Sequence, residues 1–478
     1  MEPDNRLSTS EDSITTQGSH HVHVVDNEET EEESSPLEVS IPIQSAAETT
    51  SMGRRKIHKV PSLLRVNKEH LYTPVAVSLG PYHHGRSQFP QVEDFKVEML
   101  DSFVAANAPK DKGFFYSKIF ERVDEIRGHY EEGSTDELND EAFAEMILLD
   151  TCFIIYFMKC RVEKIIERLY VFRQRIGWLA YRFVLMDLFK LENQIPLWVI
   201  SLLYALIFHD EDDGEALVCN YLSNFLKIEY NYAVQQMIRG DENEPPLHLL
   251  EAKQRVLFGH PPNMESDPGC LADILKLMKG RQRRKRPNES VFKQLSHPFR
   301  SVTDLKAKGI RFSASSNCLL NARFHSYCFY GLLQLPVLFV HDSTRVFFSN
   351  AIAFEMSPET KSDLTLTSYV NFMKSLIENP KDVKELRENG ILFSRLGSDE
   401  EVVQVFKEID TYGLSSGNVF QDVKMRIEEH CNSKAKTWTA ELIHTYFRTP
   451  WTAVALFAAV FLLCLTFLQT FYTIRPAN

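Results

Sequence analysis

The stretch EAFAEMILLDTCFIIYFMKC, residues 141–160, decides the fold because it is apolar on nearly every side. A helix that is hydrophobic all round is buried in a core, so this stretch predicts a central buried helix. A second long apolar segment, RFVLMDLFKLENQIPLWVISLLYALIF, covers 182–208 and contains Pro196. Proline removes a backbone donor and disfavours a helical conformation at the residue before it. The sequence therefore predicts two helices that meet at ENQIP (192–196).

The fold class that follows is mainly α. From Ile57 onward apolar residues recur at spacings of three and four, as at Phe95, Met99 and Phe103. This period is typical of amphipathic helices. A helical domain is expected over 53–447, and its later helices are expected at 368–377, 400–409 and 419–430.

A small antiparallel β element is expected at about 309–350. Its segments are rich in β-branched and aromatic residues, and HDST (341–344) lies between the last two as a hairpin turn. The predicted strands are GIRFS (309–313), ARFHSYCFY (322–330), LPVLFV (335–340) and RVFFSN (345–350).

The C-terminal segment WTAVALFAAVFLLCLTFLQTFYTI (451–474) has no charged residue. As a helix it would extend roughly 36 Å, against about 30 Å for the hydrocarbon core of a bilayer. A buried core helix is the alternative, but the unbroken apolar run favours one transmembrane helix within 448–478, with the lipid bilayer as partner of 451–474. Lys434, Lys436 and Arg448 precede it, and the polar, acidic N-terminus carries no signal peptide. We therefore expect a single-pass membrane protein with a cytosolic body.

Charge is concentrated at the N-terminus. The chain carries a net charge of -12, and residues 1–50 hold twelve acidic residues against one basic residue, Arg6. Such a segment buries too little apolar surface to fold, so 1–52 is expected to be a disordered acidic tail. The remainder is nearly neutral and offers no broad cationic field, so no nucleic-acid partner is expected.

Residues from about 240 to 300 are rich in proline, charge and small polar residues, which predicts an irregular surface insertion. It contains the basic cluster RQRRKR (281–286). This cluster could be a nuclear address, a nucleic-acid patch or a contact with acidic lipid. We favour a solvated loop, and we expect the sequon at Asn288 to be unused in a cytosolic body.

The stretch GPYHHGRS (80–87) differs by one residue from the phosphate-binding pattern GxxxxGK[ST]. That loop works because small residues let successive N–H groups converge on phosphate. Here Pro81 has no N–H, bulky residues follow it, and Pro90 disfavours a helix directly after the loop. We therefore expect a structural turn rather than a nucleotide site. His83 and His84 are adjacent, so their side chains diverge, and no metal site is expected.

The segment GLSSG (413–417) matches the nucleophile elbow GxSxG. That motif requires a strand before the serine and a helix after it. Because the preceding segment, 400–409, has a helical pattern, we expect a connection between two helices instead.

The cysteines contain no CxxC and no zinc spacing, so they are expected to be reduced thiols, mostly buried.

Four polar residues, Asp150, Asp187, Glu192 and Asn193, lie in very apolar helical segments. Buried carboxylates are costly unless paired. They could serve as a general acid and base, but capping of a broken helix or pairing with a cation is favoured.

Several segments together resemble one family, the plant domain-of-unknown-function 247 family, also called uncharacterised protein family 0481. The resemblance runs from Ile57 onward, and it implies a mainly helical domain with a C-terminal membrane helix. Most members have no assigned biochemistry, and some in grasses are linked to self-recognition between pollen and stigma. The segments that carry it are IHKVPSLLR (57–65), VAVSLGPYHHG (75–85), FAEMILLDTCFI (143–154), MDLFKLENQIPLWVI (186–200), HLL (248–250), SVTDLKAKGIRF (301–312), VFFSNAIAFE (346–355), NFMKSLIENPKDVKEL (371–386) and YFRTPWTAVALFAAVFLLCLTFLQT (446–470).

The function expected from the sequence is non-enzymatic recognition or signalling through an unknown protein partner. No catalytic, cofactor-binding or metal-binding residue is assigned, and no cofactor is expected. The alternative is a membrane-associated hydrolase that pairs His83 or His84 with one of the helix carboxylates.

Overall fold

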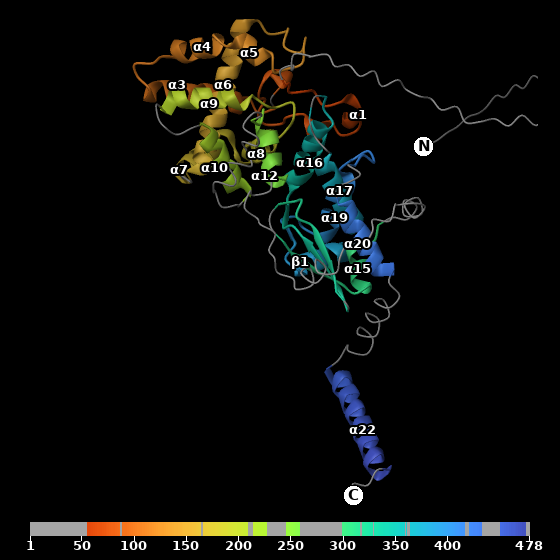
Figure 1. The fold of residues 1–478 in the computed structure, drawn as a ribbon. Coiled ribbons are helices and arrows are strands. Elements are labelled where there is room, and N and C mark those ends of the chain that lie inside the picture. The colour runs from red at the N-terminus through yellow and green to blue at the C-terminus, as the bar shows by residue number, and fades with distance from the viewer. Residues whose placement is uncertain are drawn as a thin grey trace, which may run out of the picture. The chain divides into compact units, whose positions relative to one another are not determined.

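The computed structural model describes residues 55–86, 88–163, 166–208, 214–226, 245–258, 299–315, 318–327, 329–358, 360, 364–415, 420–432 and 450–474. The acidic tail, the basic cluster 281–286 and Asn288 lie outside these residues. Figure 1 shows the elements in chain order. The helices of the first half are α1 (Ser62–Arg65), α2 (Glu69–Tyr72), the 3-10 turn η1 (Pro81–His83), α3 (Pro90–Ala106), α4 (Lys112–Phe120), α5 (Val123–Arg127), α6 (Asp140–Val162), α7 (Ile166–Ile176), α8 (Trp178–Asp187), α9 (Leu197–Phe208), α10 (Gly214–Leu226) and α12 (Leu249–Phe258).

The second half contains short strands among helices. The strands are β1 (Ile310–Ala314), β2 (Arg323–Ser326), β3 (Gly331–Leu335), β4 (Leu338–Val340) and β5 (Leu392–Ser394). The helices are α15 (Val302–Ala307), α16 (Asp342–Glu355), α17 (Thr365–Leu376), α18 (Pro380–Glu388), α19 (Asp399–Glu408), α20 (Gln421–Asn432) and α22 (Pro450–Ile474).

The predicted central helix is confirmed as α6. It begins after Asn139, whose side chain accepts a hydrogen bond from the backbone N–H of Ala142, as an N-cap does. Helices α3, α4, α9 and α10 all pack against it, so nearly every side of α6 is covered. The predicted break is also confirmed, because α8 ends at Asp187 and α9 begins at Leu197, directly after Pro196.

The β element is mixed, so the prediction of an antiparallel element over 309–350 is wrong. Strand β3 pairs parallel with β1 and antiparallel with β2, while β4 pairs parallel with β5. The last predicted strand, 345–350, lies inside α16, so there is no hairpin at 341–344. The backbone N–H of His341 donates to Thr344 Oγ1 at 2.8 Å, which caps a helix start instead. Because α16 is buried almost throughout, its short apolar run could not be distinguished from a strand by periodicity.

Two further predictions about helix boundaries are wrong. Pro90 does not prevent a helix, because it is the first residue of α3, where a missing N–H costs nothing. Helix α12 lies within the range expected to be irregular, 240–300, while 259–298 lie outside the described residues.

The predicted transmembrane helix is corrected. Within the part of the chain that the structure describes, no helix has both the length and the apolar character needed to cross a bilayer. The single-pass anchor at 451–474 is therefore wrong, and the cytosolic body that was inferred from it is withdrawn.

Candidate functional site

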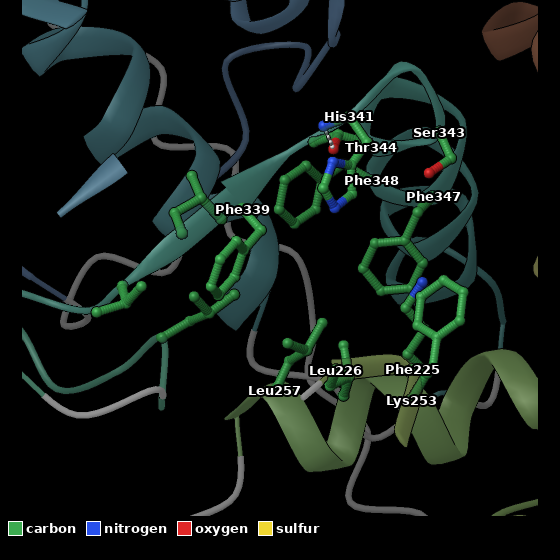
Figure 2. Close-up of a pocket in the computed structure, with 13 residues that line it drawn as sticks. Phe225, Leu226, Lys253, Leu257, Phe339, His341, Ser343, Thr344, Phe347 and Phe348 are labelled. Carbon is green, nitrogen blue, oxygen red and sulfur yellow. Dashed lines mark hydrogen bonds between the residues drawn. The ribbon is translucent and has the colours of Figure 1, made fainter. Parts of the chain in front are cut away.

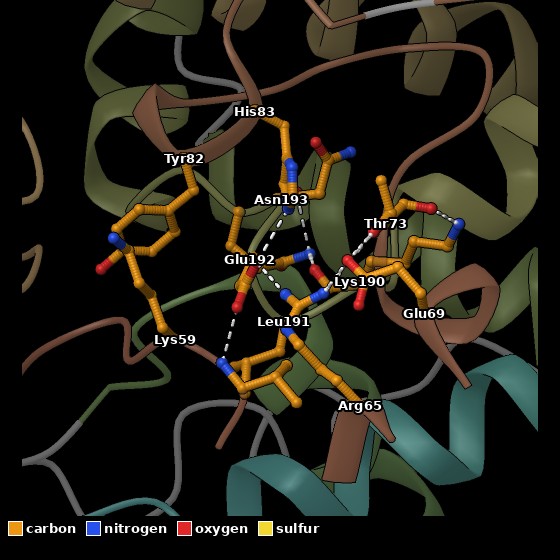
Figure 3. A network of polar contacts seen from close by, with 12 residues as sticks. Lys59, Arg65, Glu69, Thr73, Tyr82, His83, Lys190, Leu191, Glu192 and Asn193 are labelled. Carbon is orange, nitrogen blue, oxygen red and sulfur yellow. Dashed lines mark hydrogen bonds and ion pairs between the residues drawn. The ribbon is translucent and has the colours of Figure 1, made fainter. Parts of the chain in front are cut away.

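Three of the polar residues singled out in the sequence, Asp150, Asp187 and Asn193, hold the segment 73–80 in place. The fourth, Glu192, follows the end of α8 beside Asn193, in the polar network shown in Figure 3. Asp187 Oδ2 accepts hydrogen bonds from the backbone N–H groups of residues 75, 76 and 77, at 3.0, 2.6 and 3.1 Å. Its other oxygen lies 3.0 Å from Lys190 Nζ. Asp187 is therefore a buried, paired backbone anchor.

Asn193 and Asp150 continue the same attachment. Asn193 Oδ1 accepts from the N–H of Leu79 at 2.7 Å, and its Nδ2 donates to the carbonyl of Val77 at 3.1 Å. Asp150 accepts from the N–H of Gly80 at 2.8 Å and lies 2.7 Å from Lys96 Nζ. These contacts agree with the structural role favoured for these residues.

His83 and Glu192 form the buried pair that a hydrolase would need, with Nε2 and Oε2 2.8 Å apart. The carboxylate also accepts from the N–H of Val60 at 2.7 Å and pairs with Arg65. Burial alone would raise the pKa of Glu192, but the hydrogen bonds from His83 and Arg65 hold it below its usual value. A general acid needs the opposite shift. His84 is exposed, so the two histidines diverge as expected.

The stretch 80–87 forms a tight turn. Gly80 and Gly85 have φ of 71° and 73°, and η1 lies between them. The N–H of Gly80, which a phosphate loop would direct at its ligand, is directed at the carboxylate of Asp150. A phosphate would meet a negative charge at this position.

The remaining chemical motifs are placed as follows. Helix α19 precedes Gly413, so the strand required by a nucleophile elbow is replaced by a helix. Of the six described cysteines, Cys464 is exposed and the other five are buried, and no two of these six are joined to each other. Among the described residues, no group of three histidine, cysteine or acidic side chains is placed to hold a metal ion.

A cavity of about 110 Å³ lies between α10 and α12 on one side and β4 with the start of α16 on the other (Figure 2). Neither His83 nor Glu192 lines it. Most of its wall is apolar, and its polar groups are a lysine and three side chains at the start of α16. The lining residues are Phe225, Leu226, Lys253, Leu257, Leu319, Val337, Leu338, Phe339, His341, Ser343, Thr344, Phe347 and Phe348.

Lys253 is the unusual member of this wall. It is 5% exposed, and its Nζ lies 3.7, 3.8 and 4.5 Å from the ring centroids of Phe347, Phe189 and Phe225. Burial lowers its pKa well below the usual range, and no carboxylate among the described residues offsets that effect. Glu251, on the same helix, is paired with Arg55 and Arg255 instead.

Two opposing effects act on the Lys253 amine. A cation over an aromatic face gains about 0.5–2 kcal/mol. Removal of an unpaired ammonium from water costs several kcal/mol. The burial cost is larger, so folding shifts the Lys253 amine toward its neutral form and lowers its pKa. A neutral amine in an apolar cavity is both a hydrogen-bonding group and a nucleophile.

The rim of the cavity contains groups that contact solvent. Phe339 is 39% exposed, and Ser343 is partly exposed in the first turn of α16. Figure 2 shows Ser343 and His341 at the same end of the cavity, with Leu226 and Leu257 at the other. A small molecule can therefore be held with its apolar part on the leucines and aromatic rings.

The sequence interpretation missed Lys253 because 240–300 was expected to be irregular. One signal was available. In LLEAKQRVLF (249–258) apolar residues occur at 249, 250, 252, 256 and 257. Lys253 therefore lies beside the apolar stripe of a helix. A lysine in that position is either a solvent-reaching side chain or a buried amine, and the structure shows the latter.

Comparison with known proteins gives the family. A family model described as DUF247, plant protein of unknown function, matches residues 57–465. UPF0481 protein At3g47200 of Arabidopsis thaliana is 28% identical over 433 residues, covering 87% of this chain and 85% of that protein. Putative UPF0481 protein At3g02645, also of Arabidopsis thaliana, is 24% identical over 489 residues, covering 87% and 89%. No solved structure matches. The resemblance noted in the sequence is thus confirmed, and the chain belongs to the DUF247 family of plant proteins of unknown function.

Proposed function

We propose that this chain is a non-enzymatic recognition or signalling protein that binds a small, mainly apolar molecule in the Lys253 cavity. A protein partner that responds to the bound molecule is part of the proposal. The observation that carries it is Lys253 itself, a buried amine among three phenylalanine rings that has no carboxylate partner among the residues that the structure describes.

A buried lysine of this kind is costly for the fold. A buried polar group without a partner destabilises a fold by about 1–3 kcal/mol, and a methionine would fill the same volume without that cost. The other buried charges described above are engaged, as Asp187 is with three backbone N–H groups and Lys190. A role in ligand binding would account for a buried amine whose contacts with ring faces do not offset the cost of its burial.

The size of the cavity sets the size of the ligand. An apolar cavity of about 150 Å³ holds benzene with its six non-hydrogen atoms, so a cavity of about 110 Å³ encloses roughly four or five. Each methylene that enters the cavity is worth about 0.8 kcal/mol. Affinity should therefore rise along a series of unbranched alcohols from ethanol to about butanol and then level off.

The test is a calorimetric titration of the full chain with this series. Leu257→Trp fills the cavity and should abolish binding. Leu206→Trp is the matched control, because Leu206 is also partly buried but lies on α9, outside the cavity wall. Equal binding to both variants, or affinity that does not depend on chain length, would refute the proposal.

A further inference from the structure

The Lys253 cavity combines two features that together point to a particular class of ligand. Its amine is buried among ring faces at 3.7–4.5 Å, and the space beside it is apolar. A carboxylate ligand would suit a charged lysine, whereas a carbonyl compound suits a neutral one. Burial favours the neutral form here, since it lowers the pKa of Lys253 and no acid among the described residues reverses the effect.

We propose that the ε-amine of Lys253 forms a reversible imine with a small unbranched aldehyde held in this cavity. This inference rests on the proposed function and deepens it, because it names the reactive group of the ligand.

The reaction balances without any further reagent. The nitrogen lone pair adds to the carbonyl carbon, and the amine proton moves to the carbonyl oxygen to give a carbinolamine. Loss of water then forms the C=N bond, so that aldehyde and amine become imine and water with no net oxidation. The apolar wall favours the imine because it excludes the water that would reverse the reaction.

The cavity also explains why this lysine would react in preference to others. A surface lysine with a pKa of about 10.4 is neutral in roughly one molecule in a thousand at pH 7.5. Lys253 is neutral far more often, and the apolar wall adds a binding contribution of about 0.8 kcal/mol per methylene of the aldehyde, or about fourfold in affinity. Lys384, whose side chain is 64% exposed, has neither advantage.

The experiment is reductive trapping on the full chain at pH 7.5, with sub-stoichiometric pentanal and cyanoborohydride, followed by peptide mass spectrometry. We expect the adduct on Lys253 to exceed that on Lys384 by at least tenfold. Lys253→Met should abolish the specific adduct, and Lys384→Met should leave it unchanged. Leu257→Trp provides a second test that keeps the amine but fills the cavity, and it should reduce trapping at least tenfold.

The outcomes separate this inference from the proposed function. Adducts spread over surface lysines, with Lys253 modified no faster than Lys384, would overturn the imine. If pentanol still binds the cavity in that case, the proposed function stands alone. Stronger binding of pentanoate than of pentanal, without a trapped adduct, would also overturn the imine and identify Lys253 as a counter-ion. If neither pentanol nor pentanal binds, both proposals fail.

Discussion

Two buried lysines of this chain should respond in opposite directions to the same substitution. Lys253 lies among phenylalanine rings, with no acidic partner in the described part of the chain, whereas Lys96 Nζ lies 2.7 Å from Asp150 and 2.6 Å from Glu93. Burial alone would lower the pKa of Lys96, but these two carboxylates raise it above its usual value. Replacement with methionine keeps the approximate volume of the side chain and removes the amine.

The expected magnitudes follow from these contacts. Lys253→Met removes an unpaired buried amine, so the free energy of unfolding should rise by about 1–4 kcal/mol at pH 7. Lys96→Met leaves the carboxylate of Asp150 buried without its partner, so the free energy of unfolding should fall by about 3–5 kcal/mol. Urea denaturation followed by circular dichroism measures both.

The pH dependence gives the sharper result. Because the pKa of Lys253 is lowered on folding, the unfolded chain binds the extra proton, and stability rises with pH between that lowered pKa and about 10.4. The gain is about 1.4 kcal/mol per pH unit. Lys253→Met lacks it, so its advantage over the wild type should shrink as the pH rises from 7 to 9. The effect of Lys96→Met should stay constant over this range. A constant advantage for Lys253→Met, or a loss of stability like that of Lys96→Met, would refute the description of Lys253.

Three further predictions concern the fold. Gly80→Ala should lower the free energy of unfolding by about 1 kcal/mol or more beyond the loss caused by Gly85→Ala. Both glycines have positive φ, but only at Gly80 would an added Cβ meet a carbonyl oxygen, that of Gln194 at 2.9 Å. Equal losses in urea denaturation would contradict this. Asp187→Ala should destabilise the chain by about 3 kcal/mol, since it removes an acceptor of three backbone N–H groups, two of them buried. A melting temperature within 2 °C of the wild type would be inconsistent with it. A chain that starts at Met52 should keep the full-length melting temperature, because residues 1–50 are acidic and lack apolar periodicity. A drop of several degrees would show that the tail packs on the body.

The helical framework could be predicted because its signals are local. The apolar surface of α6 and the proline before α9 each act within a few residues, and both predictions are confirmed. The mixed sheet could not be predicted in this way. Parallel pairing of β1 with β3, and of β4 with β5 more than fifty residues later, depends on contacts between distant segments. The stretch 345–350, which lies inside α16, reads as a strand because a short apolar run fits both structures.

The candidate site was less accessible to sequence interpretation. The sequence singled out Asp150, Asp187, Glu192 and Asn193 as polar residues in apolar surroundings, and they are buried as expected. Their partners, the backbone N–H groups of a segment about a hundred residues earlier, carry no side-chain signal. Lys253 has the same difficulty, because its three phenylalanine neighbours come from separate parts of the chain.

The central claim is that the Lys253 cavity binds a small apolar molecule, and locating bound pentanol on the full chain tests it most directly. Nuclear Overhauser contacts can be recorded between pentanol and protonated phenylalanine rings in otherwise deuterated protein. We expect contacts to Phe225, Phe347 and Phe348, which line the cavity, and their loss in Leu257→Trp. Contacts confined to exposed rings such as Phe329, which is 62% exposed, and unchanged by Leu257→Trp, would contradict the account.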